Sequence, residues 1–169
     1  DCLLSRGLGD VYKRQVEKVQ TNEADIAIAG RPETLPGSIG FMPLGLIPLV
    51  LIAPALPCPV RSQATQPHPD WAQIPFILPA QGPSRRRIDL WFRHRHIANP
   101  LIYATVSGHE AIVSMVALGC GIALLPDVVL ENSPEPIRNR ILELEDVEMV
   151  APFELGAVSY THLRAHETR

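Results

Sequence analysis

The sequence predicts an α/β fold of the doubly wound type, and three observations support this fold class. Short, continuously apolar runs of the kind that form buried strands recur along the chain. Longer stretches, in which apolar residues are spaced as on one face of a helix, alternate with these runs. The resulting order of strand, loop, helix and strand is typical of a sheet covered by helices. A chain of 169 residues is long enough to bury a core of its own.

The composition is that of an ordinary globular protein, and it argues against several function classes. The chain is 46% hydrophobic and 20% charged, and its net charge of −3 leaves no basic footprint for nucleic acid. Prolines and Gly45 interrupt the most apolar stretch, residues 41–56, so we expect no membrane-spanning segment. Three scattered cysteines predict no disulfide framework and fit a reducing, cytoplasmic compartment.

The first half of the chain is predicted to be rich in strands. The expected elements are a helix end at residues 16–23, strands at 25–30, 39–44 and 47–53, and a loop at 31–37. The run at residues 47–53 is apolar throughout, as in a strand that is covered on both faces of its sheet. Residues 54–73 hold many of the 17 prolines, and we therefore expect them to be irregular.

The second half is predicted to alternate between strands and helices. The expected elements are strands at residues 75–79, 101–106, 121–125, 141–144 and 149–155, helices at 84–96 and 127–130, and a loop at 132–139. A further helix is expected between Ser107 and Gly119. Ser107 and Glu110 have the spacing of a capping box, in which each side chain satisfies a backbone donor at the helix start. The expected apolar face of this helix is formed by Ala111, Ile112, Met115, Val116 and Leu118.

The loop at residues 81–84 is a candidate binding site because it joins a strand to a helix start. Ligands of doubly wound sheets bind at the carboxyl ends of strands, where helix N-termini attract anions. This loop offers the amide of Gln81, the close approach of Gly82 and the hydroxyl of Ser84. The alternative role for Ser84 is that of a plain N-cap.

A second loop of the same kind is formed by Ser107, Gly108 and His109. Its alternative explanation is a capping role for Ser107 and a solvent-facing side chain for His109. Gly30 and Arg31 end another strand and form a third candidate. Arg31 is predicted either to pair with a ligand carboxylate or to be an ordinary surface arginine.

The residues form no recognisable catalytic or metal-binding constellation. Thr105 and His109 stand where a nucleophile elbow around Ser107 needs glycines. His109 and Glu110 begin a zinc-protease motif, but Val113 occupies the position of its second histidine. We therefore predict no catalytic residues, no metal and no cofactor, with an enzyme acting through Ser107 and His109 as a rival hypothesis.

Four segments stand in the order found in the effector domain of LysR-type transcriptional regulators. They are residues 24–29 (ADIAIA), 48–54 (PLVLIAP), 75–78 (PFIL) and 115–126 (MVALGCGIALLP). The chain from residue 16 to residue 156 resembles this family, and in particular its members that activate isoleucine–valine biosynthesis. The closer resemblance is carried by residues 33–37 (ETLPG), 51–61 (LIAPALPCPVR), 81–83 (QGP), 85–87 (RRR) and 129–136 (VLENSPEP).

The resemblance implies a type-2 periplasmic-binding-protein-like fold of two doubly wound subdomains. It implies acetohydroxy acids, namely acetolactate and acetohydroxybutyrate, as effectors, and a homo-oligomer, a tetramer, for the intact protein. DNA binding is then expected only through an N-terminal helix-turn-helix outside this chain. A periplasmic-type solute-binding protein for small anions is the alternative on the same fold.

Both ends of the chain are predicted to be foreign to the domain. Residues 1–15 and 157–169 have no hydrophobic period and resemble translated sequencing adapters, with ordinary frayed termini as the alternative. We therefore expect residues 16–156 to be a partial effector domain, truncated at both ends. Its first strand, most of its first helix and its last strand and helix are expected to be missing.

Overall fold

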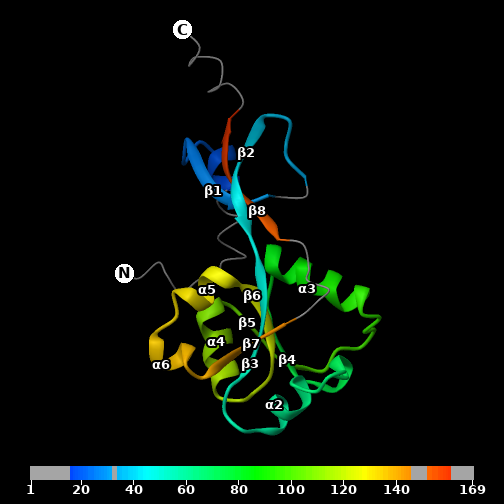
Figure 1. Ribbon diagram of the computed structural model, residues 1–169. Coiled ribbons are helices and arrows are strands. Elements are labelled where there is room, and N and C mark those ends of the chain that lie inside the picture. The colour runs from blue at the N-terminus through cyan, green and yellow to red at the C-terminus, as the bar shows by residue number, and fades with distance from the viewer. Residues whose placement is uncertain (1–15, 32–33, 146–151, 161–169) are drawn as a thin grey trace.

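The computed structural model describes residues 16–31, 34–145 and 152–160. These residues form an upper part, with strands β1, β2 and β8, and a lower part, with the remaining strands and helices α2 to α6 (Figure 1). The chain passes between the parts twice, once from β2 to β3 and once from β7 to β8. Two chain crossings between two α/β units agree with the predicted fold class.

The upper part is a three-stranded antiparallel sheet in the order β1-β8-β2, with a helical turn at residues 16–20. Its strands are β1 (Ile26–Gly30), β2 (Ile39–Ile47) and β8 (Phe153–Tyr160). The two predicted strands at residues 39–44 and 47–53 meet at Pro48 rather than near Gly45, because β2 continues through an irregularity between Pro43 and Gly45. Proline is tolerated at such a bulge, where no ladder donor is needed.

The expected boundary of the native domain, at residue 156, falls inside strand β8. Val158 is fully buried in the small core of the upper part, together with Val19, Ala29 and Ile39. The foreign origin of residues 157–169 stays a prediction, and residues 1–15 and 161–169 lie outside the described residues. The predicted strand at residues 149–155 is described only from Pro152 onward, where β8 begins at Phe153.

The sheet of the lower part combines antiparallel and parallel pairs. Strand β3 (Leu49–Pro54) pairs antiparallel with β6 (Ala123–Pro126) and β7 (Ile141–Leu144), while β4 (Phe76–Pro79) and β5 (Ile102–Val106) pair in parallel. A parallel bridge between Phe76 and Ile122 links the two groups. Parallel pairing is therefore confined to the half of the sheet that carries the two candidate loops at residues 81–84 and 107–109.

Helices cover both faces of this sheet (Figure 1). One core contains residues of α2 (Pro59–Ala64) and α3 (Pro83–His94), and the other contains residues of α4 (His109–Ala117) and α5 (Asp127–Glu131). Leu51 of β3 belongs to the first core and Ile52 to the second, so β3 is buried on both faces, as predicted. On α3, Ile88, Trp91 and Phe92 are buried as expected.

Two segments that were expected to be irregular contain helical turns. Helix α2 and the short 3-10 helix at Trp71–Gln73 lie within residues 54–73, and α6 (Glu135–Arg138) lies within residues 132–139. Pro59 stands at the first position of α2, where its missing N–H donor costs nothing. The prolines therefore start these helices rather than exclude them. In the described part of the chain, no helix combines the length and apolar character that crossing a membrane requires.

Candidate functional site

The two loops predicted to bind a ligand begin side by side. Pro79, the last residue of β4, is paired in register with Val106, the last residue of β5. The backbone N–H of Ala80 donates a 2.9 Å hydrogen bond to the carbonyl of Val106. Because β4 and β5 are parallel, the chain leaves both strands at the same edge of the sheet and enters α3 and α4 from there.

Both helices are entered through a glycine in the left-handed half of backbone space. Gly82 is the N-cap of α3 with φ of 103°, and Gly108 is the N-cap of α4 with φ of 99°. Neither N-cap supplies a side-chain hydrogen bond to its helix. Side chains with a Cβ rarely adopt such φ values, so glycine is required at both positions. The N-cap residues of two neighbouring helices thus supply no side-chain acceptor to the first N–H groups, and helix N-termini attract anions.

The capping box expected for Ser107 and the N-cap alternative for Ser84 are both wrong. Ser84 lies inside the first turn of α3 and is 4% exposed, while Ser107 is exposed and precedes the true N-cap by one residue. The capping box with Glu110 therefore does not form. Its sequence spacing is present, but the glycine at residue 108 takes the N-cap position instead.

His109 is buried, which contradicts the alternative of a solvent-facing side chain. It is 6% exposed, and within the described part of the chain neither of its ring nitrogens has a hydrogen-bond partner. Burial lowers the pKa of His109, because it disfavours the charged imidazolium, and the carboxylate of Glu110 opposes this effect only in part. His109 is thus a neutral, buried group at the start of α4.

The buried side of α4 differs in phase from the predicted one. Besides His109, its buried residues are Ile112, Val113, Val116 and Ala117. Ala111 and Leu118, which we expected on the apolar face, are exposed, with Leu118 at 69%. His109 lies one turn before Ile112 and Val113 on the same stripe, which explains its burial.

The third candidate pair lies in the upper part of the molecule. Gly30 is buried at the end of β1, and Arg31 follows it. Nη1 of Arg31 donates to Oε2 of Glu154 in β8 at 2.6 Å, and the guanidinium carbon lies 5.5 Å from the ring centroid of Phe41. The structure therefore pairs this arginine with a carboxylate of the protein itself.

Sequence reasoning missed Glu154, and it did not single out Arg85 from the run of arginines at residues 85–87. Glu154, the partner of Arg31, is separated from it by 123 residues, and no local pattern links the two. Arg85 donates from Nη1 to the carbonyl of Pro79 at 3.2 Å and from Nε to Asp89 at 3.2 Å, so its guanidinium lies beside the end of β4 as half of an ion pair. The run of arginines at residues 85–87 was the available signal.

The described residues contain no group of three metal-ligating side chains. The two loops offer backbone donors, hydroxyls, an amide and an imidazole. Such groups bind and orient a small polar ligand.

Comparison with known proteins gives this site a context. The family model described as the LysR substrate binding domain matches residues 9–167. The chain is 63% identical over 152 residues to the HTH-type transcriptional regulator IlvY of Escherichia coli K12, covering 90% of this chain and 51% of the relative. It is 46% identical over 142 residues to the activator IlvY of Haemophilus influenzae, covering 83% of this chain and 48% of the relative. The chain thus spans about half the length of these relatives.

Solved structures of regulatory domains share the fold at lower identity. The CcmR regulatory domain of Synechocystis PCC6803, in complex with 2-PG, superposes with a TM-score of 0.70 at 22% identity, covering 89% of this chain and 70% of that one. The effector-binding domain of QuiR, in complex with shikimate, gives a TM-score of 0.70 at 22% identity and covers 88% of this chain and 68% of that one.

Proposed function

The chain belongs to the LysR substrate-binding domain family, and from this membership we propose that it is the effector-sensing domain of a transcriptional activator of isoleucine–valine biosynthesis. The name of its relatives, IlvY, supports the activator role. We further propose that the effector is an acetohydroxy acid, acetolactate or acetohydroxybutyrate. The proposal covers a larger protein than this chain, since the relatives are about twice as long.

The observation that carries the proposal is the meeting of two helix starts with glycine N-caps at one edge of the sheet. Gly82 and Gly108 are the N-caps of α3 and α4, and they lie beside strands that are hydrogen-bonded through Ala80 and Val106. Two helix N-termini that open at one place favour a carboxylate there. Arg85, which is anchored to the end of β4 and ion-paired with Asp89, lies beside this edge.

The rest of an acetohydroxy acid matches the side chains of the same loops. Such an acid carries one carboxylate, a ketone and a tertiary hydroxyl on a small aliphatic frame. The amide of Gln81 and the hydroxyl of Ser107 are exposed side chains that can exchange hydrogen bonds with the ketone and the hydroxyl. The imidazole of His109, buried without a partner among the described residues, is expected to gain one when a ligand orders the loop.

Effector binding would act on the relation between the two parts of the molecule. The upper part brings Arg31 to the end of β1, and the lower part brings the loops that follow β4 and β5. A ligand shifts the balance between two arrangements only by its difference in affinity for them. In the intact homo-oligomer, this shift would be passed to the DNA-binding domains outside this chain.

The test uses the full-length regulator and a titration with acetolactate followed by calorimetry. Gln81→Ala combined with Ser107→Ala is expected to weaken binding by about tenfold or more, equivalent to about 1.4 kcal/mol. Ser62→Ala combined with Gln63→Ala changes two exposed residues of α2 and serves as the matched control. Unchanged affinity in the first double variant would reject the site, and absence of binding by the unmodified protein would reject the effector.

A further inference from the structure

The imidazole of His109 is buried at the start of α4 without a hydrogen-bond partner. Only 6% of the residue is exposed, and neither ring nitrogen is paired with any group of residues 16–31, 34–145 and 152–160. Side chains on a helix lean toward its N-terminus, so this imidazole leans toward the loop at residues 107–109. A buried polar group without a partner costs free energy, which a ligand at that loop can recover.

A carboxylate of the protein already stands at this helix start. Glu110 lies in the first turn of α4, and its Oε2 atom is 3.5 Å from the position that a Cβ on Gly108 would take. The side chain of Glu110 is therefore folded back over the N-cap. Burial lowers the pKa of His109, and the carboxylate of Glu110 raises it by less, so the imidazole of the free protein stays neutral near pH 7.

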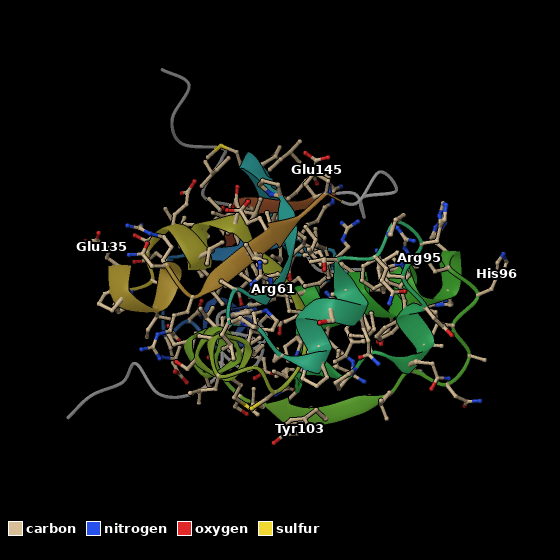
Figure 2. All side chains as sticks on the ribbon, turned by 60° about the horizontal axis from the view of Figure 1, so that its bottom comes forward. Arg61, Arg95, His96, Tyr103, Glu135 and Glu145 are labelled. Atoms are coloured by element: carbon tan, nitrogen blue, oxygen red, sulfur yellow. The ribbon has the colours of Figure 1, made fainter. Side chains whose placement is uncertain are left out.

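The other titratable groups near α4 come from the elements that pack against it, which are β3 to β7, α5 and α6. Strands β3, β4 and β6 contain no titratable side chain. The remaining elements carry Tyr103, Asp127, Glu131, Glu135, Arg138 and Glu143. Figure 2 shows Tyr103 and Glu135 at the outside of the molecule, where both side chains point outward. Glu110 is the charged group that shifts the pKa of His109.

An effector carboxylate at the two helix starts would change the charge balance around His109. It would bring a second negative charge to the place where Glu110 already stands, and two carboxylates at close range repel each other. A neutral imidazole has one N–H donor, whereas an imidazolium has two donors and a positive charge. Protonation of His109 would therefore offset the repulsion and provide charge-assisted hydrogen bonds for the carboxylates.

We propose that effector binding is coupled to the uptake of a proton by His109. The inference rests on the proposed function, because it takes the ligand of the loops at residues 81–84 and 107–109 to be a carboxylate. The proton comes from solvent and forms an N–H bond on the unprotonated ring nitrogen, and no other covalent bond changes. Affinity for the effector then rises as the pH falls, and the regulator senses effector concentration and pH together.

The first test follows acetolactate binding to the full-length regulator by calorimetry between about pH 6 and pH 8, in phosphate and in Tris, whose heats of ionisation differ. Proton uptake makes the observed binding enthalpy differ between the two buffers. The affinity is expected to rise by about threefold to tenfold for each unit by which the pH falls, because one linked proton allows at most tenfold.

The outcomes of this first test are distinct. Equal enthalpies in the two buffers and an affinity that does not change with pH would overturn the coupling to His109 while leaving the effector site in place. Absence of acetolactate binding at every pH would overturn the proposed effector, and this inference with it.

A second probe separates the carboxylate from the rest of the ligand. Acetoin has the ketone and the hydroxyl of acetolactate but no carboxylate. It is expected to bind about tenfold or more weakly than acetolactate at the acidic end of this range, and without proton uptake. Proton uptake with acetoin as large as that with acetolactate would overturn the role of the carboxylate.

The third test changes the histidine. His109→Gln keeps a side chain that forms hydrogen bonds but takes up no proton in this pH range, so its affinity for acetolactate is expected to be independent of pH. His94→Gln removes an exposed histidine at the end of α3 and is the matched control, expected to keep the pH dependence of the unmodified protein. Circular dichroism verifies that both variants are folded, and the buffer comparison on the unmodified protein needs no variant. Undiminished proton uptake in His109→Gln would assign the proton to another group and overturn the proposal.

Discussion

Arg31 and Glu154 are joined twice, through a 2.6 Å ion pair between their side chains and through a 2.8 Å hydrogen bond from the Arg31 N–H to the Glu154 carbonyl. Their side chains are 56% and 36% exposed. Ion pairs this exposed contribute little to stability, because water screens them. The pair therefore matters more for where it holds the guanidinium of Arg31 than for the fold.

Release of this guanidinium is expected to strengthen effector binding. In Glu154→Gln, Arg31 loses its competing carboxylate, and we expect acetolactate to bind about threefold to tenfold more tightly. Arg31→Ala is expected to weaken binding, and both variants are expected to change the free energy of unfolding by less than about 1 kcal/mol. Calorimetry and urea denaturation measure the two quantities. If both variants bind acetolactate as tightly as the wild type does, Arg31 is not part of the effector site.

Acidification is expected to destabilise the protein through His109. Burial lowers the pKa of His109 in the folded state, whereas the unfolded chain has the ordinary value of 6.5. The unfolded chain therefore binds a proton at a higher pH than the folded chain does. The contribution of neutral His109 to the free energy of unfolding is fully present above pH 6.5 and is lost as the pH falls below 6.5. His109→Leu should flatten this part of the pH profile of unfolding free energy. His96→Gln, at an exposed position, is the control, and an unaltered slope in His109→Leu would contradict the prediction.

The glycines at the helix starts are expected to be irreplaceable. Gly108→Ala forces a side chain into a φ near 99° and should cost about 1–3 kcal/mol of unfolding free energy. Gly37→Ala is a matched control, because a Cβ there would meet nothing within 4 Å. Thermal unfolding measures both. Gly108→Ala should also weaken acetolactate binding. If Gly108→Ala is as stable and binds acetolactate as tightly as Gly37→Ala, the backbone at residue 108 can relax and the prediction is wrong.

Close packing makes Gly121 intolerant of any side chain. A Cβ at this position would lie 2.6 Å from the carbonyl oxygen of Pro75. Overpacking of this kind typically costs about 1–3 kcal/mol, so Gly121→Ala should lower the midpoint of urea denaturation. Gly45→Ala, in open space, should not. An unchanged midpoint in Gly121→Ala would mean that the segment before β6 shifts without cost.

Much of the fold follows from local patterns in the sequence. Apolar runs mark the strands, and the helical spacing of Ile88, Trp91 and Phe92 correctly predicts the buried face of α3. The adjacency of the two candidate loops follows from the parallel pairing of β4 and β5, which alternation of strand and helix predicts.

What local patterns miss depends on backbone geometry or on distant partners. The capping box at Ser107 has the right spacing, but the φ of Gly108 moves the helix start by one residue and turns His109 inward. From the sequence alone, Pro59 indicates a break in helical structure, but the structure places it at the first position of α2, where proline is tolerated. The pairing of Arg31 with Glu154 depends on β1 meeting β8 across most of the chain.

The pairing of β1 with β8 also has a consequence for folding during synthesis. On the ribosome, β1 and β2 emerge early, yet the strand that lies between them is added after every element of the lower part. The lower part has all its strands before β8 is synthesised, and domains fold as units while the nascent chain grows. Among the described elements, the upper sheet therefore closes last. Until β8 is made, β1 and β2 have unpaired edges to which other strands can pair.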